Sequence, residues 1–425
     1  MKNKIAFVSA YASPLAVLGG IDSGGQNVYV ADLAKHLAKN GYEIDIFTRW
    51  EDGNEPTIID WETGIRVIHV EAGPKNIISK ESLMTYMPDF TASMLAFMKQ
   101  HNLLYDLVHA NFWMSGMVAC QLKLLENIPF VITFHALGAI RKLYQKEVDK
   151  FPEIRTDIEA EIVKYADQII AECPQDRLDL INYYQAPDDK ITIIPCGFNK
   201  EEFYPVNKNY ARKLLHLNTE ENVILQLGRM VPRKGIDNVI SALAQLNRKK
   251  IRVRLVVVGG EENQNRSLEL KRLEMLADYE EVDLLVDFVG RKERELLKYY
   301  YSAADIFITT PWYEPFGITP LEAMACGTPV IGSNVGGIKY SVVDGKTGFL
   351  IPPKNPDILA QKIEELLCDK KLMFDMGAEA IKRVNGEFTW THVSSKVSDL
   401  YQSILQTTQK DHLTGSSAPS AWLSI

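Results

Sequence analysis

Short apolar runs alternate with amphipathic helical patterns along most of this 425-residue chain, and this alternation restricts the fold more than any other feature. The runs at residues 5–9, 44–48 and 130–134 have the length and apolar content of buried strands. A helical pattern at residues 28–37 lies between the first two runs. Strand–helix–strand units of this kind form parallel sheets, so we expect an α/β protein with doubly wound sheets.

The same pattern begins again in the second half, where a predicted strand at residues 223–227 precedes a predicted helix at 236–246. The stretch between the halves, residues 196–205, is irregular. A chain of this length is too long for one ordinary core. We therefore predict two Rossmann-like domains, at residues 1–200 and 208–385.

The end of the chain has a different character. Residues 388–405 show a further helical pattern, which we place in a terminal helix at residues 386–406. The tail at residues 407–425 is polar and rich in serine, and such composition favours disorder.

Composition excludes several classes of protein. The net charge of −8 argues against nucleic acid as the partner. No apolar run is long enough to span a bilayer, and the short run after the basic N-terminus fits a first strand better than a signal peptide. The five cysteines are scattered and no pair has metal-ligand spacing, so we expect reduced core thiols in a cytoplasmic protein: Cys120, Cys173, Cys196, Cys326 and Cys368.

A loop and helix follow the predicted strand at residues 305–309. Glu314 lies in the loop, and Gly317 and Ile318 lie at the N-terminus of a helix predicted over residues 316–325. Free backbone N–H groups and the positive end of the helix dipole favour anions or hydroxyls at such a place. Glu322 supplies a second carboxylate within the helix. Two glutamates alone are more often a capping residue and a solvated side chain, so a ligand-binding interpretation needs support from other residues.

Two basic residues support the interpretation as a ligand-binding site. Arg229 and Lys234 follow the predicted strand at residues 223–227 in a loop flanked by glycines. Basic loop residues are usually solvated, but the carboxyl ends of parallel strands are where open α/β sheets bind ligands. Arginine binds phosphate as a fork and lysine as a point charge, so the pair suits a diphosphate.

The first half also places polar groups after strands. A glycine-rich loop at residues 19–27 precedes the helix at 28–37, without the spacing of a nicotinamide-binding motif. It is either a mobile turn or a set of backbone amides facing a phosphate or sugar. His135 ends the strand at residues 130–134, before Gly138 and a basic helix start. A lone histidine is usually structural, but this position favours a role in a site.

These motifs resemble the signature of retaining glycosyltransferases of family four, which include sucrose-phosphate synthases and inositol-phosphate glycosyltransferases. Glu314 and Glu322 enclose the Pro-Phe-Gly of that signature, residues 135–138 are similar to its histidine motif, and residues 22–30 are similar to both branches. The similarity extends over residues 4–405. It implies the GT-B fold, two Rossmann-like domains facing across a cleft, with the terminal helix crossing back onto the first.

The resemblance also implies an activity: transfer of a hexose, with glucose from UDP-glucose as the family's commonest case, and with retained anomeric configuration. Catalytic roles fall to His135, Arg229, Lys234 and Glu314. No Asp-x-Asp motif is present, so no divalent metal and no cofactor are expected. The implied donor-binding residues are Gly24, Gly25, Arg229, Lys234, Gly290, Arg291, Glu314, Phe316, Gly317, Ile318, Thr319 and Glu322.

The resemblance further implies a phosphorylated acceptor, such as fructose 6-phosphate or inositol phosphate, because Lys75 and Arg155 match residues that hold the acceptor phosphate. Each of them alone would be read as surface charge. Phe112 and Ala136 replace a tyrosine and a threonine of the inositol branch, which removes two hydroxyls from the acceptor side. The expected acceptor-binding residues are Gln26, Asn27, Lys75, Arg141, Lys142 and Arg155.

Two alternatives compete with a nucleotide-sugar donor and a phosphorylated small-molecule acceptor. One is a membrane-associated glycosyltransferase with a lipid-linked or polysaccharide acceptor, in which the basic segment at residues 140–150 touches anionic lipid. That segment contains Glu147 and Asp149 and lacks a broad apolar face. The other is a non-catalytic sugar-nucleotide-binding protein, which the complete set of site residues disfavours. The donor base and sugar, the acceptor and the oligomeric state stay open.

Overall fold

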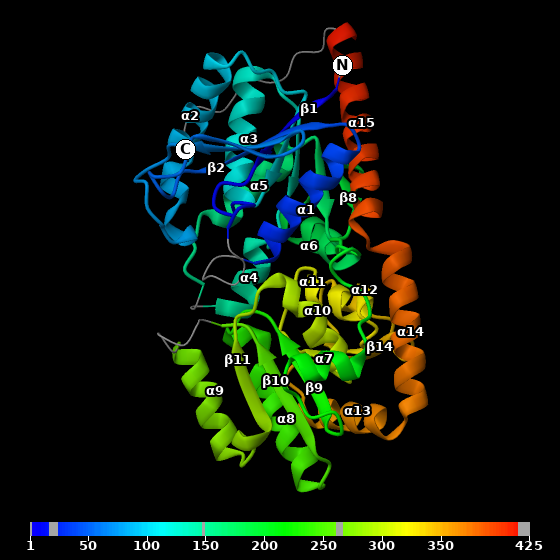
Figure 1. Ribbon diagram of the computed structural model, residues 1–425. Coiled ribbons are helices and arrows are strands. Elements are labelled where there is room, and N and C mark those ends of the chain that lie inside the picture. Colours follow the sequence, from blue (N-terminus) through cyan, green and yellow to red (C-terminus); the bar gives the residue numbers. More distant parts are fainter. Residues whose placement is uncertain (1, 17–23, 147–148, 261–266, 415–425) are drawn as a thin grey trace. The chain divides into compact units, whose positions relative to one another are not determined.

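A computed structural model describes residues 2–16, 24–146, 149–260 and 267–414, and these form two compact units (Figure 1). Among them, the first unit contains residues 2–16, 26–195 and 393–414. The second contains residues 24–25 and 196–392. The chain thus passes into the second unit after Pro195 and returns to the first after His392.

The first unit is built on an eight-stranded sheet of order β3-β4-β2-β1-β5-β6-β7-β8. All neighbours pair in parallel except β3, which pairs antiparallel with β4 at the edge. The strands are β1 (Lys4–Val8), β2 (Glu43–Arg49), β3 (Ile58–Glu62), β4 (Ile65–Val70), β5 (Leu107–Asn111), β6 (Phe130–Thr133), β7 (Gln168–Ala171) and β8 (Ile191–Ile193).

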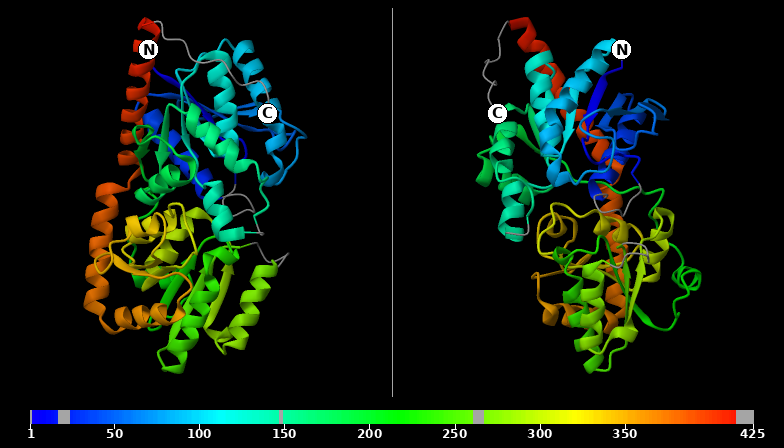
Figure 2. Two further views of the ribbon diagram at one scale, coloured as in Figure 1. Left: turned by 180° about the vertical axis from the view of Figure 1, so that it is seen from behind. Right: turned by 90° about the vertical axis from the view of Figure 1, so that its left-hand side faces the viewer.

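Helices cover both faces of this sheet, as Figures 1 and 2 show. Helices α2, α3 and α5 pack on one face, and α1 and α15 lie against the other. The helices are α1 (Gly25–Lys39), η1 (Lys80–Ser82), η2 (Met84–Tyr86), α2 (Met87–Gln100), α3 (Trp113–Glu126), α4 (Gly138–Gln145), α5 (Arg155–Tyr165), α6 (Pro174–Tyr184), η4 (Asp188–Lys190) and α15 (Trp390–Thr414).

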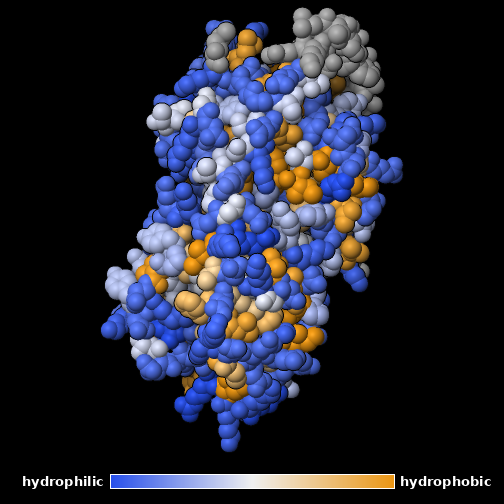
Figure 3. Space-filling model, turned by 90° about the vertical axis from the view of Figure 1, so that its right-hand side faces the viewer, coloured by the Kyte–Doolittle hydropathy of each residue, from blue (hydrophilic) through white to orange (hydrophobic). Residues whose placement is uncertain are grey.

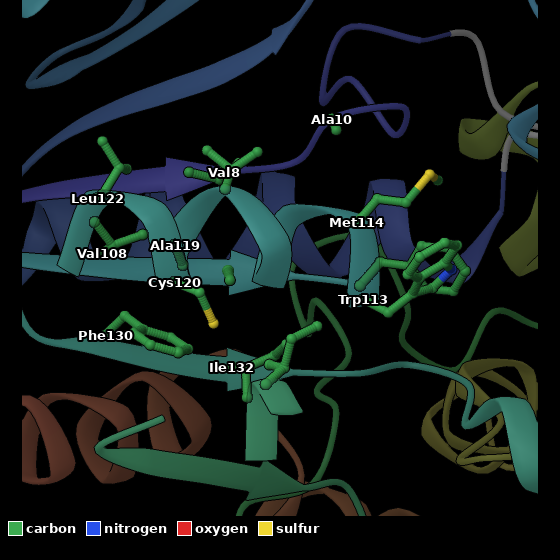
Figure 4. Close-up of a cluster of buried hydrophobic side chains, with 14 of the residues drawn as sticks. Val8, Ala10, Val108, Trp113, Met114, Ala119, Cys120, Leu122, Phe130 and Ile132 are labelled. Atoms are coloured by element: carbon green, nitrogen blue, oxygen red, sulfur yellow. The ribbon is translucent and has the colours of Figure 1, made fainter. Parts of the chain in front are cut away.

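Alternate side chains of the strands build the two faces. Val8 and Val108 meet Ala119 and Cys120 of α3 in the core drawn in Figure 4. Phe7 and His109 point to the opposite face, where their rings lie 4.9 Å apart. His109 Nδ1 lies 2.6 Å from the Tyr401 hydroxyl, so α15 is docked by a hydrogen bond into the first sheet. Burial lowers the pKa of His109 to about 3, and the ring is neutral.

The second unit has a six-stranded, fully parallel sheet of order β11-β10-β9-β12-β13-β14. Helices α8 and α13 pack on one face. The strands are β9 (Asn222–Leu227), β10 (Val253–Val258), β11 (Val286–Gly290), β12 (Ile306–Thr309), β13 (Val330–Ser333) and β14 (Gly348–Ile351). The helices are α7 (Lys208–Leu214), η5 (Pro232–Lys234), α8 (Ile236–Arg248), α9 (Leu268–Tyr279), η6 (Asp283–Leu285), α10 (Arg294–Ala303), α11 (Ile318–Ala325), α12 (Ile338–Ser341), α13 (Pro356–Cys368) and α14 (Lys370–Glu387).

The structure confirms the predicted class, two α/β units with parallel, doubly wound sheets, and it corrects several details. Helix α11 begins at Ile318, two residues later than predicted, because Gly317 has a φ of 92° that a helix does not accept. Helix α15 continues to Thr414, well into the tail that we expected to be disordered. Cys368 is exposed, although the other four cysteines are buried as predicted. Residues 19–23, 147–148 and 415–425 lie outside the described residues.

On the face drawn in Figure 3, apolar residues form separate groups among hydrophilic ones. Within the described ranges, none of the helices combines the length and the apolar character that crossing a bilayer requires.

Candidate active-site residues in the two units

In each unit the strand order reverses at one point, and in the second unit predicted site residues follow both strands beside it. The reversal lies between β9 and β12 in the second sheet and between β1 and β5 in the first. At such a switch point the loops from neighbouring strands diverge and leave room for a ligand at the carboxyl ends. The loop at Arg229 to Lys234 follows β9, and the loop of Glu314 follows β12.

The structure of the second unit brings these two loops together through an ion pair. Lys234 Nζ lies 2.5 Å from Glu314 Oε2, and Arg233 Nη1 lies 3.4 Å from the same oxygen. The side chains of Lys234 and Glu314 are only 16% and 13% exposed. A carboxylate therefore holds two cations side by side at the ends of adjacent strands.

Mutual attraction sets the protonation of this pair. Burial by itself would raise the pKa of Glu314, but Lys234 and then Arg233 outweigh burial and lower it to about 2. Burial lowers the pKa of Lys234, while Glu314 opposes that shift. The carboxylate is ionised at neutral pH, and its negative charge supports the positive charge of the lysine.

Close backbone packing holds the two loops. Gly235 has a φ of 68°, and a Cβ there would lie 2.2 Å from the carbonyl oxygen of Thr310. The hydroxyl of Thr310 donates to the Gly235 carbonyl at 2.8 Å. On the other side of the Glu314 loop, a Cβ on Gly336 would lie 1.7 Å from the Glu314 carbonyl oxygen. The glycines let backbones touch, so the ion pair sits on rigid supports.

Glu322, the second glutamate of the signature, is buried in the first turns of α11. Its Oε2 accepts a 2.8 Å hydrogen bond from the Tyr301 hydroxyl, and its Oε1 lies 3.6 Å from Arg294 Nη1. Burial raises the pKa of Glu322 despite the arginine. Arg294 also bonds Glu202, so α10 contributes a cation to this carboxylate.

The other predicted donor residues lie in the same unit. Arg229 follows β9, Gly290 ends β11 with a φ of 69°, and Arg291 follows it. Phe316 is buried, and Gly317 precedes the first turn of α11, which begins with Ile318 and Thr319. Gly24 and Gly25 directly precede or begin α1. The loops after three strands of the second unit, β9, β11 and β12, therefore contain predicted donor residues.

In the first unit the predicted histidine lies among polar side chains from neighbouring strands. His135 follows β6; its Nδ1 lies 3.2 Å from Glu172 Oε1 and its Nε2 lies 3.1 Å from Asn111 Oδ1. Asn111 ends β5, and Glu172 follows β7. The ring of Tyr29 meets the His135 ring edge-on, 4.7 Å away between centroids. None of these three neighbours was among the residues predicted from the sequence.

Gln26 and Asn27 lie in the first turn of α1 and bond to loops of the first unit. The Gln26 amide oxygen accepts from the Tyr11 hydroxyl at 2.6 Å, and its nitrogen donates to the Asn111 carbonyl at 3.3 Å. The Asn27 amide donates to the Ser13 carbonyl at 2.9 Å. Both side chains therefore tie the start of α1 to the loops after β1 and β5.

Lys75 lies in a loop that a buried arginine supports. The Arg49 guanidinium, at the end of β2, donates to the carbonyls on either side of Lys75, at 2.8 Å for Pro74 and 2.5 Å for Asn76. Lys75 Nζ pairs with Glu71 at 2.6 Å and lies 3.5 Å from the centroid of the Trp50 ring. Its side chain is 36% exposed, so the ammonium is held but accessible.

Arg155 is much less accessible, since its side chain is 1% exposed. Its guanidinium bonds Glu159 at 2.7 Å and the Ala136 carbonyl, and it stacks on the rings of Phe112 and Phe151. Its buried Nη1 has no hydrogen-bond partner within the described part of the chain. Arg155 therefore supports the loop that follows His135, and its Nη1 is the donor without a partner in the described part of the chain.

Arg141 and Lys142 lie on α4, near the aromatic residues that surround Arg155. Arg141 pairs with Asp149 at 3.0 Å and lies 4.9 Å from the centroid of the Phe151 ring, as Arg155 lies 4.5 Å from it. Lys142 donates to the Glu153 carbonyl at 3.2 Å. Arg141 and Arg155 therefore share one aromatic ring, whereas Lys75 belongs to another part of the first unit.

Several residues near the candidate site were not predicted, because nothing in the sequence around them indicates a role in binding. Arg233 adjoins Lys234, and the sequence does not show which of the two faces Glu314. Tyr301 and Arg294 lie on a helix whose amphipathic pattern predicts packing only. Glu172 and Asn111 could have been found from position, because each ends or follows a strand next to that of His135.

Comparison with known proteins identifies the family of the chain. Residues 207–383 match the family model described as Glycosyl transferases group 1, and residues 23–202 match Glycosyltransferase Family 4. A relative named D-inositol 3-phosphate glycosyltransferase, from Corynebacterium diphtheriae, is 33% identical over 94% of this chain and 95% of its own length. Another of that name, from Corynebacterium urealyticum, is 34% identical over 94% and 96%.

Solved structures show the same fold. Sucrose-phosphate synthase from Thermosynechococcus elongatus superposes with a TM-score of 0.88 and 35% identity, covering 96% of this chain and all of that one. Anabaena HepE in complex with UDP-glucose superposes with a TM-score of 0.75 at 20% identity, covering 94% and 99%. The chain therefore belongs to the group 1 and family 4 glycosyltransferases and is an enzyme of the GT-B type.

Proposed function

We propose that this enzyme is a retaining hexosyltransferase that moves glucose from UDP-glucose to a phosphorylated sugar or polyol, such as fructose 6-phosphate or inositol phosphate. The ion pair of Lys234 with Glu314 at the switch point of the second unit supports the proposal most strongly. Both side chains are mostly buried, and a buried pair at a ligand edge is typical of a functional site.

The second unit supplies the charges that a sugar nucleotide requires. Lys234, with Arg229 and Arg233 in the same loop, would bind the diphosphate and stabilise the negative charge that grows on it as it leaves. Glu314 would accept hydrogen bonds from glucose hydroxyls, and Glu322 from the ribose hydroxyls. Gly317, which lacks a Cβ and precedes α11, would let the ligand approach the helix N-terminus closely.

The chemistry breaks the bond between the anomeric carbon and the phosphate oxygen and forms a bond from that carbon to the acceptor oxygen. The transition state is oxocarbenium-like, and the leaving phosphate takes the proton of the acceptor hydroxyl. His135 would contact the donor sugar near the reacting carbon. No side chain acts as a nucleophile in this scheme, and no divalent metal is required, so a chelator should leave turnover unchanged.

The first unit supplies a cation for the acceptor phosphate. Lys75 is accessible, and Arg49 fixes the backbone on both sides of it. A lysine on a fixed loop is a suitable phosphate ligand. The relatives named D-inositol 3-phosphate glycosyltransferase and the neighbour named sucrose-phosphate synthase support this choice. The five free cysteines support a cytoplasmic location.

A release assay for nucleoside diphosphate tests the proposal. UDP-glucose, ADP-glucose, UDP-N-acetylglucosamine and GDP-mannose are each combined with fructose 6-phosphate, inositol 3-phosphate and the free sugars. We expect strong turnover with UDP-glucose and one phosphorylated acceptor. Equal turnover with the unphosphorylated sugar would contradict the role of Lys75. Donor hydrolysis alone would favour a lipid-linked or polysaccharide acceptor, and the absence of any donor reaction would favour a binding protein.

A further inference from the structure

We propose that Glu172 is a positioning residue for catalysis, because its carboxylate, together with the Asn111 amide, fixes the orientation of the His135 ring. The inference rests on the proposed function, in which His135 contacts the donor sugar. It assigns a role to a residue that follows a different strand, β7, and that forms no part of the motifs described above.

Three adjacent strands of the first sheet converge on this histidine. Strands β5, β6 and β7 are neighbours, and their carboxyl ends present Asn111, His135 and Glu172 in that order. The two ring nitrogens lie 3.1 Å and 3.2 Å from oxygens of Asn111 and Glu172. The side chains of His135 and Glu172 are 9% and 4% exposed. A partner on each side leaves the ring little freedom to rotate.

The backbone of His135 is itself in an unfavourable conformation. Its φ of 58° lies in the left-handed region, which is unfavourable for a non-glycine residue. Such a conformation persists only where surrounding contacts determine it, and it occurs often at functional sites. Glu172 and Asn111 supply these contacts from the neighbouring strands. The Tyr29 ring, 4.7 Å away, limits the histidine from a third direction.

The carboxylate also selects the protonated nitrogen of the ring. Asn111 donates its amide nitrogen to the His109 carbonyl at 3.3 Å, which turns its oxygen toward His135 Nε2. Both ring nitrogens therefore face acceptor oxygens, and a neutral imidazole can donate to only one of them. A carboxylate is the stronger acceptor, so in the neutral ring the proton lies on Nδ1, toward Glu172.

The carboxyl group of Asp176 contacts the backbone of Glu172. The backbone N–H of Glu172 donates to Asp176 Oδ2 at 2.9 Å. Burial, followed by the charge of Glu172, raises the pKa of Asp176 to about 8. At neutral pH Asp176 is therefore protonated and adds no second negative charge beside Glu172. Two other buried carboxylates of this unit, Asp45 and Glu159, are paired to arginines.

The test is the Glu172→Gln variant, which keeps an acceptor oxygen of the same reach but removes the charge. We expect kcat to fall about 10- to 100-fold, as for residues that orient a catalytic histidine, with the KM for UDP-glucose changed less than about threefold. In protein labelled with 15N-histidine, the ring signal of His135, assigned with His135→Asn, should shift toward the other tautomer.

Asp45→Asn is the matched control, because Asp45 is also a buried carboxylate, 4% exposed, with an ion pair in the same unit. It should leave kcat and the His135 signal unchanged even where it lowers the thermal midpoint. A wild-type kcat in Glu172→Gln, or an equal loss of kcat in both variants, would overturn the inference. Near-normal turnover of His135→Ala would instead refute the proposed role of the histidine, so the two failures are distinguishable.

Discussion

The two units share one architecture, but the polar residues at the carboxyl ends of their strands differ in chemical character. In each, a largely parallel sheet reverses its strand order, and polar residues gather at the carboxyl ends of neighbouring strands. In the second unit these residues are charged: Lys234 and Arg233 flank Glu314. In the first unit a histidine lies among an amide, a carboxylate and an aromatic ring.

The difference follows from what each unit has to bind in the proposed reaction. A diphosphate carries formal charge and gains more as it leaves, so fixed cations stabilise the transition state there. A sugar ring presents hydroxyls and C–H faces, for which hydrogen bonds and aromatic edges are sufficient. The sharpest test of this comparison is whether removal of a charge lowers turnover more in the second unit than in the first.

The largest effect is expected in the second unit. Lys234→Ala removes a cation from the leaving diphosphate and leaves Glu314 with Arg233 as its closest partner, so turnover should fall roughly a hundredfold or more. Steady-state kinetics with UDP-glucose and the preferred acceptor measure it. Lys249→Ala removes a lysine with an equally short ion pair, to Glu364 on the surface, and serves as the control. A near-wild-type rate for Lys234→Ala would show that this lysine does not stabilise the leaving diphosphate.

The units should also differ in their response to acid. Glu314 has a pKa lowered to about 2, so its stabilisation is complete above about pH 4.5 and is lost only as the pH falls toward 2. His109 has a pKa of about 3 in the folded state and 6.5 as its ordinary value, so the unfolded chain binds the proton first. Its contribution to stability is complete above pH 6.5 and is lost as the pH falls below it.

At pH 5 this proton linkage should lower the stability of the first unit by about 2 kcal/mol relative to pH 7. Amide hydrogen exchange, corrected for the intrinsic pH dependence, measures this in each unit separately. We expect β5 and α15 to lose protection before β9 and β12. Loss of protection in the second unit first would contradict the assignment of a neutral, buried His109.

The fold was predictable because its signal is local and repeated. Buried parallel strands are short apolar runs, and the structure has strands at residues 4–8, 43–49 and 222–227 where such runs occur. Strand β3 was missed because only one neighbour, β4, pairs with it at the sheet edge, so its sequence is mixed. Helix α3 was missed because Gly116 and Ser115 interrupt the pattern in a helix buried on several sides.

The candidate site was predictable only where charge and position coincide. Glu314 and Lys234 each follow a strand, and the sequence alone suggested that they share a ligand. Their direct ion pair depends on which strands are neighbours in the sheet, and β9 and β12 are separated by about 80 residues. The same long-range pairing hid Glu172, which reaches His135 only because β7 lies beside β6.

A smaller effect is expected at the acceptor side of the first unit. Lys75→Ala should raise the KM for the phosphorylated acceptor about tenfold, because one hydrogen bond to a charged group at a partly exposed site is lost. Donor hydrolysis should not change. Lys35→Ala is a matched control, since Lys35 has the same exposure, an acidic partner and a tryptophan ring beneath it. An equal effect of both variants would exclude a specific phosphate contact at Lys75.

The smallest expected effect is a decrease in the KM for the acceptor, opposite to the increase expected for Lys75→Ala. Glu71 pairs with Lys75 at 2.6 Å and is 64% exposed, so an incoming phosphate competes with this carboxylate. Because exposed ion pairs contribute at most about 1 kcal/mol, Glu71→Gln should lower the KM for the acceptor about two- to fivefold. The gain should vanish in the Lys75→Ala background, which a double-mutant cycle measures. A higher KM in Glu71→Gln would mean that Glu71 itself binds the acceptor, and that the first unit uses charge of both signs.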